Sequence, residues 1–204
     1  MKKLLVFLFA TTLVFSMVGG VALATVIDFE VLADLEVVDD QFLALGADFN
    51  GDASILSAGT SLSPLYPPFS GSNVIFDDPA LGTGGEIRVD AVGMNWSTVG
   101  AYVTGSTDIT LTAYAYDGTV LGTDSTGSAN YIGAGTGLAP NIFLSVAGAS
   151  IAWAIFSDTG NSYVLDDFTF EAAAAAPVPE PATMLLLGSG LAGLIGFRKK
   201  FRKS

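Results

Sequence analysis

Short apolar runs with a period of two recur between residues 25 and 171, and turn-forming residues separate them. In the clearest run, 108–116, apolar residues at 109, 111, 113 and 115 alternate with Thr or Tyr at the even positions between them. Alternation of this kind sends one set of side chains to the core face of a strand and the other set to the opposite face. No long stretch has helical periodicity, so the sequence predicts an all-β fold.

The spacing of these runs predicts about nine or ten antiparallel strands, which favours a two-sheet sandwich. Besides 108–116, strands are expected at 26–30, 42–49, 74–76, 86–94, 98–104, 119–122, 142–146, 150–157 and 163–171. Residues 34–41 are predicted as a turn or short helical passage, and Asp117-Gly118 as a type I′ hairpin turn. We expect a jelly roll, because the first and last strands are both strong and suited to pair; a closed barrel is the alternative.

The first 24 residues have the layout of a cleaved signal peptide. Lys2 and Lys3 precede an apolar core at 4–18, and the small residues Ala22 and Ala24 form a cleavage box before Thr25. We therefore expect Sec-type export, with an uncleaved anchor helix as the alternative.

The C-terminal end has three parts in order. Residues 172–178 are interpreted as a linker, and Pro179, Glu180 and Pro181 follow. Sixteen uncharged residues, 182–197, come next; as a helix they would span about 24 Å, somewhat less than a hydrocarbon core of about 30 Å. A basic cluster suited to stop transfer ends the chain: Arg198, Lys199, Lys200, Arg202 and Lys203.

Residues 179–204 resemble the PEP-CTERM sorting signal, in which Pro-Glu-Pro precedes a short apolar helix and a basic tail. The resemblance implies recognition by an exosortase, a membrane-embedded cysteine transpeptidase/protease of Gram-negative bacteria that make extracellular polysaccharide. We expect a protein held in the inner membrane by its C-terminal helix, then cut and delivered to the surface or medium. An ordinary tail anchor is the alternative.

Charge and composition exclude several function classes. Between residues 25 and 171 the chain has one basic residue, Arg88, and nineteen acidic ones, a formal charge of −18. Such a surface repels phosphate backbones, which argues against nucleic-acid binding, while it suits divalent cations. The chain has neither Cys nor His, which rules out disulfides, thiol nucleophiles, Ser-His-Asp triads and imidazole-bound zinc.

The middle of the chain resembles the β-sandwich domain common in PEP-CTERM proteins, which is similar to jelly-roll carbohydrate-binding modules. The residues that carry this resemblance are 27–30, 41–49, 68–73, 113–118 and 165–170. It implies a structural calcium ion between an acid of the opening strand, Asp28 or Glu30, and one of the last strand, Asp166 or Asp167. Alternation with Val164, Phe168 and Phe170 predicts that Asp166 points inward and Asp167 to solvent.

Two further motifs each have two interpretations. Residues 48–52 begin like a calcium loop but have Ala53 where the loop needs glycine, so an Asx turn is the favoured interpretation. Tyr114 and Tyr116 share a face of the predicted strand and are candidates for a glycan platform, with ordinary sheet packing as the alternative.

These features predict a non-enzymatic, exported envelope or matrix protein associated with exopolysaccharide or biofilm. A carbohydrate-binding module that grips one specific glycan is the alternative. A glycoside hydrolase is less favoured, because no pair of carboxylates has a sequence context that would raise one pKa.

Overall fold

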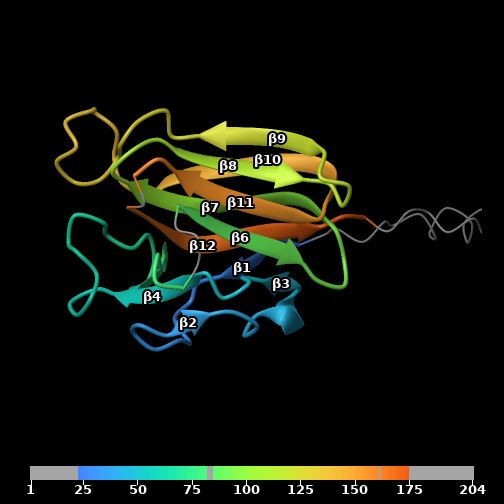
Figure 1. Cartoon of the computed structure of the whole chain (residues 1–204), viewed down its shortest axis with the longest axis horizontal. Helices are drawn as coiled ribbons and strands as arrows, with labels where there is room; N and C mark the ends of the chain where they lie inside the picture. The colour runs from blue at the N-terminus through green and yellow to red at the C-terminus, as the bar shows by residue number, and fades with distance from the viewer. Residues whose placement is uncertain (1–22, 82–84, 161, 175–204) are drawn as a thin grey trace, which may run out of the picture. The chain divides into compact units, whose positions relative to one another are not determined.

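A computed structural model describes residues 23–81, 85–160 and 162–174 (Figure 1). The predicted signal peptide up to residue 22, the Pro179–Pro181 motif, the C-terminal apolar segment and the basic cluster lie outside the described residues. The chain divides into two units, Met1–Ala173 and Ala174–Ser204, and all described strands belong to the first. Among the described residues, no helix has the length and apolar character needed to cross a membrane.

Two antiparallel sheets form a sandwich. The first contains, in spatial order, β10 (Ile142–Ile151), β7 (Trp96–Gly105), β12 (Tyr163–Ala172), β5 (Asn73–Asp77), β4 (Ala53–Ser57) and β2 (Val37–Val38), and β1 (Thr25–Ile27) also pairs with β12. The second contains β3 (Ala47–Asp48), β6 (Glu86–Ala91), β11 (Trp153–Asp158), β8 (Ile109–Tyr114) and β9 (Val120–Ser125). The predicted all-β, two-sheet architecture is confirmed.

The first and last strands lie side by side, as the jelly-roll prediction requires. Thr25 pairs with Phe170 and Ile27 with Phe168 in an antiparallel register. From β2 onward the chain crosses repeatedly between the sheets, so that strands adjacent in space are mostly distant in sequence. The fold is therefore a jelly-roll sandwich.

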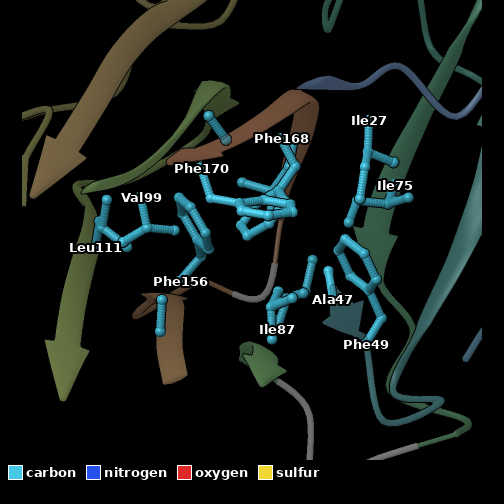
Figure 2. Close-up of a cluster of buried hydrophobic side chains, with 14 of the residues drawn as sticks. Ile27, Ala47, Phe49, Ile75, Ile87, Val99, Leu111, Phe156, Phe168 and Phe170 are labelled. Carbon is cyan, nitrogen blue, oxygen red and sulfur yellow. The ribbon is translucent and has the colours of Figure 1, made fainter. Parts of the chain in front are cut away.

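The core lies between the two sheets and is rich in phenylalanine (Figure 2). Phe29, Phe42 and Phe49 make mutual edge-to-face contacts with ring centres 5.5–5.8 Å apart. Phe49 continues the series to Phe168 at 5.4 Å. Each buried ring contributes roughly 1.5–3 kcal/mol through removal of apolar surface from water. With no disulfide available, this packing is the main source of stability.

Several predicted element boundaries are wrong. The strand expected at 42–49 is a 3-10 turn, η2 (Leu43–Leu45), followed by the two-residue β3. Gly46 ends the turn with a φ of 103°, a conformation that glycine adopts at little cost, and this breaks the apolar run. Residues 34–41 contain the two-residue β2, and β4 was not predicted.

The Ser- and Pro-rich segment after β4 covers part of the outer face of the first sheet. Its Leu62 packs on Val74 of β5 and Val164 of β12, and Tyr66 and Phe76 border this second apolar cluster. Residues on that side of β5 and β12 are therefore buried although they do not face the main core.

Candidate functional site

A hollow of about 520 Å³ opens at one end of the second sheet. Arg88 and Asp90 of β6 line it together with Trp153 at the start of β11, Tyr116 of the β8–β9 turn, and the 93–95 segment that follows β6. Because neighbouring strands run antiparallel, the last residues of β6, the first of β11 and the last of β8 lie at the same end of the sheet. The hollow is thus assembled from three neighbouring strands.

Trp153 is the central ring of this site. It pairs in register with Asp90 on one side and Tyr114 on the other. Its ring stacks on Tyr114 with centres 5.4 Å apart and planes 14° apart, and the guanidinium carbon of Arg88 lies 4.8 Å from its centre. Aromatic and cation–π contacts on neighbouring strands fix the orientation of the ring.

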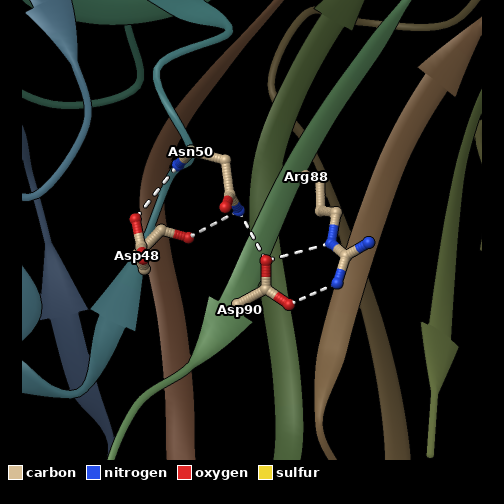
Figure 3. A network of polar contacts seen from close by, with 4 residues as sticks. All are labelled: Asp48, Asn50, Arg88 and Asp90. Carbon is tan, nitrogen blue, oxygen red and sulfur yellow. Dashed lines mark hydrogen bonds and ion pairs between the residues drawn. The ribbon is translucent and has the colours of Figure 1, made fainter. Parts of the chain in front are cut away.

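A polar network continues across the same face toward β3 (Figure 3). Arg88 donates from Nε and Nη2 to the two carboxylate oxygens of Asp90, at 2.9 and 2.6 Å. The Asn50 side-chain amide also donates to Asp90, and the Asn50 backbone amide donates to Asp48. Hydrogen bonding to Asp90 raises the pKa of Arg88 above its ordinary value, so the guanidinium stays charged. The Arg88–Asp90 pair is therefore a fixed, charge-compensated element of the site.

Tyr116 lies in the hairpin turn, whose type differs from the prediction. The Gly118 amide donates to the Ala115 carbonyl, and only Gly118 of this turn has a positive φ, 85°. The connection is therefore a type I turn followed by a left-handed glycine, rather than a type I′ turn at Asp117-Gly118. Strand β8 ends at Tyr114, and Tyr116 in the turn is 91% exposed.

Both predicted tyrosines lie near Trp153, in different ways. Tyr114 is half-buried and stacks on Trp153, whereas Tyr116 lines the hollow with it. Their role in glycan binding stays a prediction. The sequence analysis did not place Trp153, Arg88, Asp90 or Asn50 in one site. Two features of the sequence could have pointed to this site: Arg88 is the lone cation of residues 25–171, and it lies two residues before Asp90. The pairing of β6 with β11, which brings Trp153 beside them, could not be predicted from the sequence.

The acids predicted to bind calcium hold a loop instead of converging on one point. Asp166 accepts hydrogen bonds from the backbone amides of Phe69 and Ser70, at 2.6 and 2.8 Å. Asp167 accepts the Ser70 hydroxyl at 2.7 Å, and Glu30 accepts the Ser72 and Asn73 amides at 2.8 and 2.7 Å. The remaining predicted ligand, Asp28, accepts the Glu30 amide at 3.2 Å. Asp166, Asp167 and Glu30 together hold residues 69–73.

Asp166 does not share a face with Phe168, contrary to the alternation argument. Asp167 has a φ of 46°, and the β12–β7 register shifts between Asp166 and Thr169. This bulge reverses the alternation, so that Phe168 faces the main core while Asp166 lies on the outer side, beneath the loop. Burial raises the pKa of Asp166 to about 6, despite the amides that favour its charged form.

Calcium binding stays a prediction. The described residues include no group of three or more acidic side chains arranged to hold a metal ion. At residues 48–52 the Asx-turn interpretation is confirmed, because the Asp48 carboxylate accepts the amide of Asn50, two residues later, at 3.1 Å.

Several solved structures are similar to this chain, all at low identity. One is TmCBM61 in complex with beta-1,4-galactotriose, with 10% identity, a TM-score of 0.32, and 71% of this chain and 90% of that chain covered. A DUF4465 family protein from Bacteroides caccae has 11% identity, a TM-score of 0.38 and coverages of 62% and 79%. A variant of CBM29-2, a family 29 carbohydrate-binding module, has 10% identity, a TM-score of 0.35 and coverages of 79% and 99%.

With TM-scores below 0.5, these likenesses carry no information about the ligand of the sandwich. No curated protein matches the chain. Residues 177–203 match the family model of the PEP-CTERM protein-sorting motif, and the resemblance of the C-terminal segment to that sorting signal is thereby confirmed.

Proposed function

We propose that this chain is an exported, non-enzymatic protein that an exosortase sorts to the cell surface, where its sandwich binds exopolysaccharide through the ring-lined hollow. The observation that carries the binding proposal is the grouping of Trp153, Tyr114 and Tyr116 beside the fixed Arg88–Asp90 pair. The sorting motif at 177–203 supports the route. Association with a biofilm matrix follows from the two together.

The proposed route has three steps. The leader takes the chain through the Sec-type machinery, and the C-terminal segment then holds it in the inner membrane. Exosortase cleavage near Pro179–Pro181 ends this attachment and passes the sandwich to the surface or the medium. In this scheme the chain is the substrate of the processing enzyme.

The chemistry of the hollow suits a sugar. Pyranose rings combine apolar C–H faces with hydroxyl groups, so they bind where aromatic side chains stand beside a few positioned polar groups. Tyr116 offers an exposed ring, and Arg88, Asp90 and Asn95 supply polar atoms at the same hollow. The volume lies within the range of ordinary small-ligand pockets, roughly 300–1,000 Å³.

The same geometry gives little support to a glycoside hydrolase. Such enzymes need two carboxylates that face one cleft, one of them held protonated. Among the described residues that line the hollow, Asp90 is the one carboxylate, and both its oxygens accept hydrogen bonds from Arg88. Asp166, whose pKa is raised, lies beneath the 69–73 loop and away from the hollow.

Affinity electrophoresis of the purified protein in a panel of soluble polysaccharides tests the binding proposal. Tyr116→Ala should weaken the binding of any polysaccharide that retards the wild type by about tenfold or more, as expected for loss of a stacked ring (roughly 1–2 kcal/mol). Its melting temperature should not change, because Tyr116 is 91% exposed. Phe143→Ala, which removes an exposed ring from the first sheet, is the matched control and should bind like the wild type. Equal retardation of all three proteins, or retardation of none, contradicts the proposal.

A further inference from the structure

We infer that the ring-lined hollow selects uncharged polysaccharides and excludes polyuronates; this inference rests on the proposed glycan-binding function. Recognition of an acidic sugar commonly uses an arginine, whose planar guanidinium binds a carboxylate through two parallel hydrogen bonds. Arg88 is the only basic residue between residues 25 and 171. It is therefore the one side chain of the sandwich able to bind a uronate in this way.

Asp90 already occupies one of the two bidentate edges of Arg88 and compensates its charge. Nε and Nη2 of Arg88 donate to Oδ2 and Oδ1 of the same carboxylate, which is the arrangement that a uronate would need. Asn50 donates to Asp90 as well, so the carboxylate is held by two residues. At this edge a uronate would have to displace a carboxylate that is fixed two residues away on the same strand, and at any other edge it would meet a guanidinium whose charge Asp90 already compensates.

The surroundings of the pair add repulsion. Glu86, Arg88 and Asp90 all lie on the outer face of β6, because the intervening Ile87 and Val89 are fully buried. Asp48 extends the same network from β3, and Asp117 follows Tyr116 in the turn. Arg88 is thus the one cation of this face, and its charge is compensated by Asp90. At physiological salt, repulsion between exposed charges of this kind acts over about 8 Å.

A neutral sugar meets neither obstacle. Its hydroxyl groups form hydrogen bonds with the positioned polar atoms without separating the Arg88–Asp90 pair, and its apolar faces contact Trp153 and Tyr116. The Arg88–Asp90 ion pair then stays intact and lines the hollow when the sugar is bound. Selection against charge would follow from the pair, and affinity from the rings.

The test compares a neutral glucan, galactan, mannan and xylan with polygalacturonate, using the purified full-length protein and two variants. Asp90→Asn keeps the shape of the side chain but releases the charge of Arg88. It should raise the ratio of polygalacturonate affinity to neutral-glycan affinity by about tenfold or more, as expected for charge-assisted hydrogen bonds. Asp40→Asn makes the same charge change at an exposed position outside the hollow and should leave the ratio within about twofold.

The outcomes separate the inference from the function on which it rests. Binding of no polysaccharide by the wild type removes the proposed function. Wild-type binding of polygalacturonate as tight as neutral binding, or an unchanged ratio in Asp90→Asn, overturns the inference while glycan binding stands. If Asp90→Asn does not fold, wild-type binding at about 50 and about 500 mM salt replaces it. Neutral binding should then change little, and polygalacturonate binding should emerge only at high salt; its absence at both contradicts a charge-based exclusion.

Discussion

Asp166 combines deep burial with three amide donors, and its titration should therefore be measurable in the stability of the fold. It is 1% exposed, and burial raises its pKa to about 6 from 3.8. The folded state thus holds the proton more tightly than the unfolded state between these values. Its contribution to stability is fully present below about pH 4 and is lost as the pH rises through about 6.

The free energy of unfolding of the wild type, minus that of Asp166→Asn, should rise by about 1–2 kcal/mol from pH 7 to pH 4, after allowance for solvent screening. The comparison with Asp166→Asn is needed because other carboxylates, such as Glu30 and Asp34, have lowered pKa values and act in the opposite direction. Urea unfolding at four pH values measures the difference. A difference that stays constant or shrinks toward pH 4 would show that Asp166 is not the titrating group.

Calcium binding at the predicted acids can also be tested residue by residue. Asp166 and Glu30 use both carboxylate oxygens as hydrogen-bond acceptors, which leaves second oxygens of Asp28 and Asp167 for a metal. If calcium binds there, millimolar calcium should raise the melting temperature of EDTA-treated protein by about 4 °C or more, the shift that corresponds to roughly 1–2 kcal/mol. Asp28→Asn should abolish the shift, and an unchanged wild-type melting temperature would reject the site.

At the scale of elements, two glycines restrict the sheets for different reasons. Gly118 needs a positive φ in the β8–β9 turn, and nothing lies within 4 Å of an added Cβ. Gly100 in β7 has an ordinary φ, but an added Cβ would lie 2.5 Å from the Leu144 carbonyl oxygen of β10. Gly118→Ala should therefore cost about 1–2 kcal/mol of backbone strain.

Gly100→Ala should cost more, about 3 kcal/mol or above, because a backbone atom of the adjacent strand has to move. Denaturant unfolding of both variants and of an exposed control, Val120→Ala, ranks the three. If Gly100→Ala is no more destabilised than Gly118→Ala, then the β7–β10 contact is looser than described.

The strands that sequence reasoning located are those with clean alternation, β8 above all, because burial of one face has a direct period-two signature. The bulge at Asp167 was missed because a single backbone dihedral reverses the alternation without changing the pattern of residue types. The loop that covers Val164 was missed because its shape depends on hydrogen bonds to Asp166 and Glu30 from distant strands. In the candidate site, Tyr114 and Tyr116 could be named from one strand alone. Trp153, Arg88 and Asn50 join them only through the pairing of β3, β6, β11 and β8.

At the scale of the whole molecule, the pairing of β1 with β12 determines where the chain enters and leaves the sandwich. Because Thr25 lies opposite Phe170 in an antiparallel pair, the residues before β1 and those after β12 depart from the same end. The amide of Ala173 donates to the Asn95 carbonyl at that end. The described residues next to the predicted leader and those next to the sorting segment therefore lie at the same end of the sandwich.

The predicted leader and the sorting motif at 177–203 imply two cuts, and the intact mass of the protein from the surface and medium of its host measures them together. The recovered chain should begin at Thr25 and end near Pro179. In a host that lacks the exosortase, the mass should retain the C-terminal segment while the leader is still lost, because Sec-dependent processing does not require the sorting motif. A mass that keeps residues 182–204 in the normal host would instead identify a permanent anchor. A mass that keeps residues 1–24 but has lost the C-terminal segment would mean that the Ala22–Ala24 box is not cut. The leader would then still be joined to β1, the strand that pairs with β12.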